Sequence, residues 1–257
     1  MEINFYVINL DKSQERLNLI SSQFNAQKIY INRVPAIDGM EINLNKEADN
    51  EACKYEMGRN IQAGEVGCFL SHIKALKLFE NSNSEFAVIL EDDAIISNNF
   101  SNQIKDLCIF LQNNLSSDIC AINLGPSDYK YTSKVASFSD INLLKAHRFP
   151  MLATGILWTR RGAELILSQH KKVKYPYDNY LRMALTNSSN GLSVKPAVVW
   201  AADVTSDIEV RSAFKGRSRE NRSNFYFIKK QKRVFREKII AIISIFKWHF
   251  LNQNSNK

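Results

Sequence analysis

Three consecutive acidic residues, Glu91, Asp92 and Asp93, follow directly after an apolar run at residues 86–90. So short and apolar a run is typical of a central strand that is buried on both faces of a parallel sheet. Carboxylates crowded at the end of such a strand repel one another and lose hydration unless a cation lies there. Because ligands of open α/β sheets bind beyond the carboxyl ends of the strands, the cluster predicts a divalent-metal site for a phosphate-bearing substrate. The alternative is a solvated acid cluster between a strand and a loop.

The three acids are expected to have different roles. If the strand continues through them, Glu91 and Asp93 point to one side and Asp92 points to the other. We therefore expect Asp93 to bind the metal directly, with Glu91 assisting directly or through water or a ribose. Asp92 is expected to face a structural partner, and it is also a candidate residue for binding the phosphate-bearing ligand.

A second polar group lies in the segment GEVGCFLSH at residues 64–72, which predicts the start of an amphipathic helix. Glu65 and His72 are seven residues apart and therefore lie in one stripe of that helix. Glu65 either caps the helix start or contacts a ligand. His72 is a candidate metal ligand or phosphate donor, with a packing role as the alternative.

The elements that must position these residues begin with a predicted strand at residues 3–10. A helix with one apolar face follows, and then a second predicted strand at residues 28–37. A strand, a helix and a strand in so short a span predict a parallel βαβ unit and an α/β fold. Asn9 and Leu10 at the end of the first strand are candidate ligand contacts. Arg16 lies within reach of that strand end and suits binding of a phosphate or stacking on a ring, or else a surface salt bridge.

Positive charge is concentrated at the end of the 257-residue chain, whose net charge is +8. Residues 215–257 contain twelve Lys or Arg and two acids, so residues 1–214 sum to −2. We predict a catalytic domain at 1–214 and a tail at 215–257. The tail contains the apolar run IIAIISIF at 239–246, with Trp248 and Phe250 after it.

An apolar block flanked by basic residues is typical of an amphipathic helix in the interface of an anionic membrane. The alternative is a last helix packed on the body with solvated charges. Nucleic acid is not an expected partner, because the basic residues are not interleaved with stacking aromatics.

Other features exclude several classes of protein. The four cysteines have no C-x-x-C spacing, so neither a zinc site nor a disulfide framework is expected, and a reducing compartment fits. The N-terminus has no signal-peptide pattern, and no apolar run reaches the ~20 residues that span a bilayer. The sequence DKSQ after the first strand lacks a Gly-rich phosphate loop, which disfavours a nucleotidyltransferase.

Three motifs follow one another in the chain: INLDKSQERL with PAIDG after it, GEVGCFLSH, and VILEDDA. Together they resemble glycosyltransferase family 25, the bacterial lipooligosaccharide galactosyltransferases. The stretch ATGILWTRRGAELIL is similar to a further family segment, more loosely, and YPYDNYL resembles the family's P-x-D segment, which places its aspartate at Asp178. The resemblance covers roughly residues 3–210.

The resemblance implies a single Rossmann-type domain of GT-A fold with a mostly parallel central sheet. It implies inverting transfer of galactose from UDP-galactose to a sugar hydroxyl of the lipopolysaccharide core, assisted by Mn²⁺ or Mg²⁺. Similar basic tails in this family imply work in the cytoplasm, peripherally at the inner face of the bacterial inner membrane. The alternatives are a UDP-glucose or UDP-N-acetylhexosamine donor, or a catalytically degenerate membrane-binding protein.

An inverting displacement also needs a general base for the acceptor hydroxyl. Asp178 is the first candidate, from the P-x-D match, and Asp207 is the second. The alternative for each is a helix cap.

With a UDP-sugar donor implied by the resemblance, Glu65 is a further catalytic candidate that would contact the acceptor or donor sugar. Asn9 and Leu10 become candidate uridine contacts, and Arg16 a candidate for binding the phosphate or the uracil.

Overall fold

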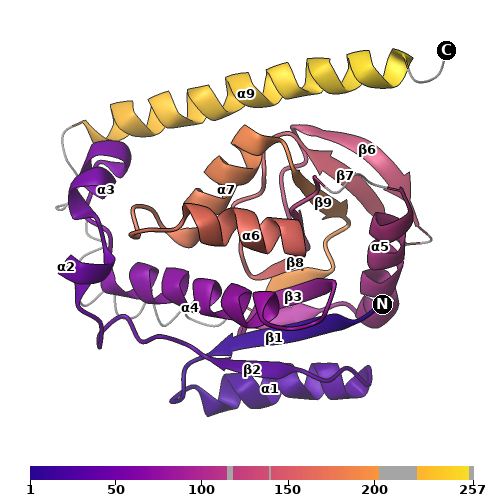
Figure 1. Cartoon of the computed structure of the whole chain (residues 1–257), viewed down its shortest axis with the longest axis horizontal. Coiled ribbons are helices and arrows are strands. Elements are labelled where there is room, and N and C mark those ends of the chain that lie inside the picture. The colour runs from indigo at the N-terminus through magenta and orange to yellow at the C-terminus, as the bar shows by residue number, and fades with distance from the viewer. Residues whose placement is uncertain (115–117, 139, 203–224, 255–257) are drawn as a thin grey trace.

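A computed structural model of the chain describes residues 1–114, 118–138, 140–202 and 225–254 (Figure 1). Within these ranges an eight-stranded sheet has the order β2-β1-β3-β8-β5-β9-β7-β6. Six of its strands point the same way, and β7 and β8 are reversed. The prediction of an α/β fold with a mostly parallel central sheet is therefore confirmed.

The strands of this sheet are β1 (Ile3–Asn9), β2 (Asn32–Pro35), β3 (Phe86–Glu91), β5 (Ala121–Asn123), β6 (Thr132–Ser137), β7 (Asn142–Ala146), β8 (Gly155–Thr159) and β9 (Gly191–Lys195). A separate pair joins β4 (Ala94–Ile96) to β10 (Val199–Ala201). The helices are α1 (Gln14–Ala26), α2 (Leu44–Glu47), α3 (Asn50–Met57), α4 (Ala63–Glu80), α5 (Phe100–Asn114), α6 (Arg160–Gln169), α7 (Tyr177–Ser188) and α9 (Tyr226–Asn254).

Alternate residues of the two central strands face opposite sides of the sheet. In β1, Tyr6 and Ile8 join a core with α4, α6 and α7, whereas Val7 joins a core with α1 and α5. In β3, Ile89 belongs to the first core and Val88 to the second. The sheet is therefore the middle of three layers, and β3 is buried on both faces, as its apolar run predicts.

Two predicted strands have different bounds in the structure. The strand expected at 28–37 is only β2, because α1 continues to Ala26 and Lys28 takes a left-handed φ of 57°. The apolar segment at 194–200 also predicts a single strand, and in the structure it is divided between β9 and β10. Pro196, which has no N–H to donate to a ladder, lies between them.

The loop after β2 fixes the position of α4. The Oγ of Ser71 on α4 accepts a hydrogen bond of 2.8 Å from the backbone N–H of Ile37. A Cβ at Gly67 would lie 2.5 Å from the carbonyl oxygen of Ile37 and 2.7 Å from the amide nitrogen of Gly39. The helix and the loop can approach this closely only because Gly67 has no side chain.

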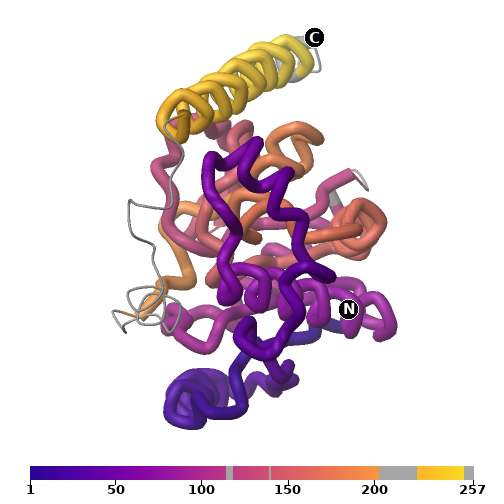
Figure 2. The backbone as a smooth tube through the Cα atoms, turned by 90° about the vertical axis from the view of Figure 1, so that its left-hand side faces the viewer, coloured from indigo at the N-terminus to yellow at the C-terminus, as the bar shows by residue number. Residues whose placement is uncertain are grey.

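Within the tail, the described residues form the helix α9, so the prediction of a helix there is confirmed. Both views show it lying across α3 and α7, with which it makes contacts (Figures 1 and 2). The predicted boundary between residues 214 and 215 falls outside the described residues. No helix in the described ranges combines the length and apolarity needed to cross a membrane.

The fit between α4 and the loop after β2 is testable by adding one methyl group. We expect Gly67→Ala to destabilise the fold by ~2 kcal/mol, because the nearest neighbours of the new Cβ are backbone atoms that must shift. Thermal unfolding followed by circular dichroism measures this. Gly125→Ala is the matched control, since its Cβ would meet nothing closer than 3.5 Å. Equal melting temperatures for the two variants would contradict this description of the helix start.

Candidate active site

The acid cluster forms a tight turn at the carboxyl end of β3. The strand ends at Glu91, which is opposite Ile8 of the parallel strand β1. Asp92 and Asp93 make the turn, and β4 begins at Ala94. The expectation that Glu91 and Asp93 share one side of a continuing strand is therefore wrong, because the strand does not continue through the acids.

Asp92 has the structural partners that were predicted for it. The side-chain amide of Asn9 donates to its Oδ2 at 2.7 Å, and Arg16 donates to its Oδ1 at 3.4 Å. Asn9 is fully buried, and its own Oδ1 accepts from Arg33 at 3.0 Å. The backbone oxygen of Leu10 accepts from the N–H of Ser13. The end of β1 therefore anchors the acid turn, and the uridine contacts expected at Asn9 and Leu10 stay predictions.

Asp93 lies in the least satisfied environment of the three acids. Its Oδ1 is buried and has no hydrogen-bond partner among the described residues. Burial, followed by the charges of Glu91 and Asp92, raises the pKa of Asp93 to about 7. The backbone around it is held by β10, since the N–H of Ala202 donates to the Asp93 carbonyl at 2.8 Å. A carboxylate with these neighbours suits a bound cation.

Glu91 is held from the other side by α4. Its Oε1 lies 3.2 Å from the Nε2 of buried His72 and accepts from the Cys68 thiol at 3.8 Å. The ligand atoms of these three residues lie within 4.8 Å of one another and could hold a metal ion. Burial, with the charges of Glu91 and Asp178, raises the pKa of the Cys68 thiol well above its usual range. The neutral thiol and His72 therefore orient Glu91, whose carboxylate is one-third exposed.

Cys68 was not among the residues singled out in the sequence. Its signal is the spacing of four residues from His72, which places both side chains on one helix face. The spacing between the cysteines themselves gives no signal for a role of Cys68, because that role depends on His72 and not on another cysteine.

Asp178 reaches the same region from α7. Tyr177 stacks on His72 with ring centroids 4.0 Å apart and an angle of 15° between the planes. Burial raises the pKa of Asp178, and the charges of Glu65 and Glu91 add to this effect. Pro176 is the N-cap and Asp178 lies in the first turn, so the helix-cap alternative for Asp178 is wrong. Asp207 lies outside the described residues.

Glu65 has the geometry of the capping alternative. Its Oε1 accepts from Arg59 at 2.7 Å, and its Oε2 accepts from Arg59 at 2.8 Å and from the N–H of Gln62 at 3.0 Å. Both oxygens are thus bonded within the protein at the start of α4. The geometry supports a role in positioning α4 rather than contact with a sugar.

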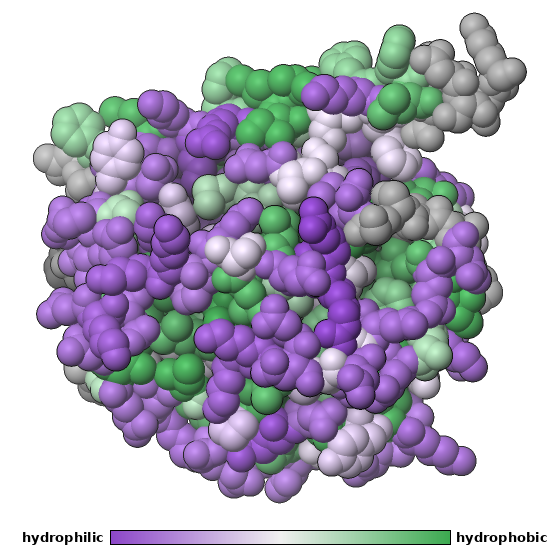
Figure 3. Space-filling view, in the orientation of Figure 1, coloured by the Kyte–Doolittle hydropathy of each residue, from purple (hydrophilic) through white to green (hydrophobic). Residues whose placement is uncertain are grey.

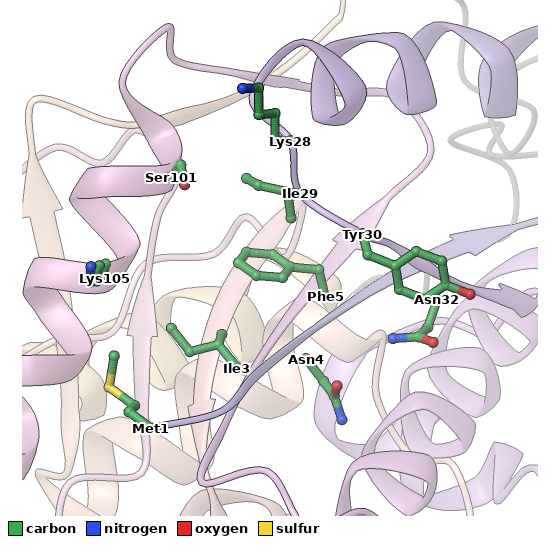
Figure 4. Close-up of a pocket in the computed structure, with 10 residues that line it drawn as sticks. All are labelled: Met1, Ile3, Asn4, Phe5, Lys28, Ile29, Tyr30, Asn32, Ser101 and Lys105. Carbon is green, nitrogen blue, oxygen red and sulfur yellow. The ribbon is translucent and has the colours of Figure 1, made fainter.

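A surface hollow of about 370 Å³ lies at the opposite end of β1 from the acids. Ile3 and Phe5 from the start of β1, Tyr30 before β2 and Lys105 of α5 contribute to its lining (Figure 4). Ligands of α/β sheets bind at the carboxyl ends of the strands, and this hollow is at the amino end. The acid turn, and not the hollow, is therefore the candidate site.

Sheet and site together define an α/β protein with an acidic site at the carboxyl edge of its central strands. The family model described as glycosyltransferase family 25 (LPS biosynthesis protein) matches residues 2–181. The chain therefore belongs to glycosyltransferase family 25, as its motifs indicate.

Relatives in this family are distant in sequence. A glycosyltransferase 25 family member of Aedes aegypti is 26% identical over 207 residues, which are 73% of this chain and 32% of that relative. Procollagen galactosyltransferase 2 of Homo sapiens is 27% identical over 111 residues, 40% of this chain and 17% of that protein. The chain thus matches at most about a third of the length of either relative.

Solved structures are more distant still. S. aureus TarS 1–349 aligns with a TM-score of 0.45 and 15% identity, covering 79% of this chain and 60% of that one. The galactosyltransferase LgtC, solved in complex with donor and acceptor sugar analogues, aligns with a TM-score of 0.37 and 11% identity, covering 78% of this chain and 87% of that one. TM-scores this low carry no argument about the fold, which is described here from the topology of the chain's own sheet.

The raised pKa of Asp93 predicts how stability depends on pH without a cation. In the folded state Asp93 has a pKa of about 7, well above the 3.8 of an ordinary aspartate. Ionisation of Asp93 therefore lowers the free energy of unfolding. This loss of stability is absent below pH ~4 and complete above pH ~7. In EDTA we expect Asp93→Asn to raise the melting temperature by at least about 4 °C at pH 8 and much less at pH 4.5.

The matched control is Asp106→Asn, which changes an exposed acid on α5 and should leave the melting temperature unchanged. Scanning calorimetry at both pH values measures the difference. If the Asp93→Asn protein is no more stable than the wild type at pH 8, ionised Asp93 does not destabilise the fold, and the prediction is wrong.

Proposed function

We propose that this chain is an inverting glycosyltransferase that moves a hexose from a UDP-sugar to a sugar hydroxyl of a lipooligosaccharide or lipopolysaccharide core. Galactose from UDP-galactose is the first candidate donor. Family membership supports glycosyl transfer, and relatives named procollagen galactosyltransferase support galactose. The observation that carries the proposal is that Asp93 has a buried oxygen without a hydrogen-bond partner in the described part of the chain, at the same sheet edge as Asp178. Transfer needs a charge-neutralising centre beside a base.

The carboxylates of the acid turn fit Mn²⁺ or Mg²⁺. Asp93, whose Oδ1 has no partner within the described ranges, and Glu91, whose carboxylate is partly exposed, are the residues that would hold the ion. A bound divalent cation neutralises the charge that develops on a diphosphate leaving group. Cys68 and His72 fix the orientation of Glu91, and Asn9 and Arg16 fix Asp92.

Asp178 is the proposed general base. Its Oδ1 accepts from the N–H and the side-chain amide of Asn179, at 2.7 and 2.9 Å, which fixes the plane of the carboxylate. The upward pKa shift makes it a better proton acceptor than an ordinary aspartate. The Tyr177–His72 stack ties the start of α7 to the helix that holds Glu91. The proton of the acceptor hydroxyl would pass to Asp178 as that oxygen attacks the donor sugar.

Replacing the proposed base should separate binding from chemistry. We expect Asp178→Asn to retain affinity for the UDP-sugar while its kcat falls by roughly 10²–10⁴-fold, the usual contribution of a general base. Donor affinity is measured by calorimetry and turnover by UDP release. Glu164→Gln, an exposed change on α6, is the control. Loss of donor binding in Asp178→Asn, or full turnover, would show that Asp178 is not the base.

The activity itself is tested with a panel of UDP-sugars. UDP-galactose, UDP-glucose and UDP-N-acetylhexosamines are incubated with the full chain, Mn²⁺ and either truncated lipooligosaccharide or no acceptor. We expect acceptor-dependent UDP release with UDP-galactose, and retention or inversion of the new linkage is read by NMR. Release from none of the donors would favour a catalytically degenerate protein, and a retained anomeric configuration would contradict the inverting mechanism.

A further inference from the structure

The face of α9 that lies on the body is held by an ion pair and a hydrogen bond between side chains. The Oε2 of Glu237 accepts from both Nη2 and Nε of Arg148, at 2.8 and 3.1 Å, and both side chains are nearly buried. Ser244 forms a hydrogen bond of 2.8 Å with the Nδ1 of buried His147. Ala241, between these two contacts, is fully buried. The orientation of the helix about its own axis is thereby fixed.

The opposite face of α9 is apolar and exposed. We call it the outward stripe, and it comprises Ile228, Phe235, Ile239, Ile242, Ile243, Phe246 and Phe250, each between 42% and 72% exposed. At 100° per residue, all seven fall in an arc of about 100° on the side away from Ala241. Apolar residues gather along the edge of the molecule where α9 lies (Figure 3).

This arrangement is the reverse of an ordinary surface helix. In a soluble protein the apolar stripe of such a helix faces the core and the charges face water. Here the contacts to the body include an ion pair and a hydroxyl hydrogen bond, and Trp248 packs edge-on against His147. The seven apolar side chains of the outward stripe, in contrast, are exposed. The sequence-based alternatives of a membrane helix and a helix packed on the body are therefore compatible, because α9 packs through its polar face.

Charge distinguishes between possible occupants of the outward stripe. Arg236, Lys238 and Lys247 border the stripe, and Lys232 lies within it. Between residues 226 and 251 the helix has seven basic residues and a single acid, Glu237, which is turned inward onto Arg148. A second copy of the chain would place two basic borders against each other. An anionic lipid surface instead supplies hydrocarbon for the stripe and negative charge for its borders.

We propose that the outward stripe of α9 inserts into the interface of an anionic lipid bilayer, with the helix axis parallel to the membrane surface. The inward contacts then hold the body in one orientation above the lipid. Because α7 packs against α9, the helix that carries Asp178 is part of this oriented assembly. Attachment of this kind does not depend on which sugar, if any, the site transfers.

Vesicle flotation of the full chain tests the proposal. Vesicles of phosphatidylcholine alone are compared with vesicles that also contain phosphatidylglycerol. We expect the wild type to float with the anionic vesicles, and its partition coefficient to fall at least about tenfold in the Ile239→Ser/Phe246→Ser variant. The Arg236→Glu/Lys238→Glu variant should lose its preference for anionic over neutral vesicles.

The matched control is Leu19→Ser/Ile109→Ser, which removes apolar side chains of similar exposure, 63% and 41%, from α1 and α5. It should bind vesicles like the wild type. Circular dichroism is used to check that all variants have the same helix content. Equal flotation of the wild type and the Ile239→Ser/Phe246→Ser variant would overturn the proposal. The proposal would also be overturned if the wild type does not bind the vesicles but forms a dimer, and if the Ile239→Ser/Phe246→Ser variant is a monomer. The stripe would then bind a second copy of the chain.

Discussion

Repulsion among carboxylates at the end of β3 is the constraint on which the rest of the site depends. Glu91, Asp92 and Asp93 are consecutive, and the charge of Glu91 also acts on Asp178 of α7. Burial and these like charges raise the pKa values of Asp92, Asp93 and Asp178. A fold optimised for stability alone would not place acids in this way, because each upward shift opposes the ionised folded state. The arrangement is understandable as a binding site for positive charge.

Different elements of the fold hold different acids of this cluster. The end of β1 and the start of α1 supply the amide and guanidinium that fix Asp92. The helix α4 supplies Cys68 and His72 to Glu91, and its own start is fixed by the Arg59–Glu65 pair and by the close approach at Gly67. Asp93 is left without such a partner among the described residues. Asp92 and one oxygen of Glu91 are thus held by neighbouring side chains, whereas the buried Oδ1 of Asp93 is not held by any described residue.

Much of this could be predicted from short-range patterns. The apolar run before Glu91 requires burial on both faces, and the glycines before Cys68 indicate a close backbone approach, so β3 and α4 follow from the sequence. The turn at Asp92 and Asp93 could not be predicted, because it depends on β10 pairing with β4 from more than 100 residues away. The stack of Tyr177 on His72 is hidden for the same reason. In α9 the apolar run predicts a helix, but the choice of face depends on Arg148 and His147 of the body.

Binding of UDP by calorimetry is the most direct test of the claim that these carboxylates require a cation. The full chain is stripped with EDTA at pH 8, where Asp93 is ionised, and titrated with UDP in the presence and absence of Mn²⁺. If the acid turn is the diphosphate site, the negative turn repels UDP unless the ion is present, and affinity rises at least about tenfold with Mn²⁺. Equal affinity with and without the ion would contradict a metal-dependent donor site at the end of β3.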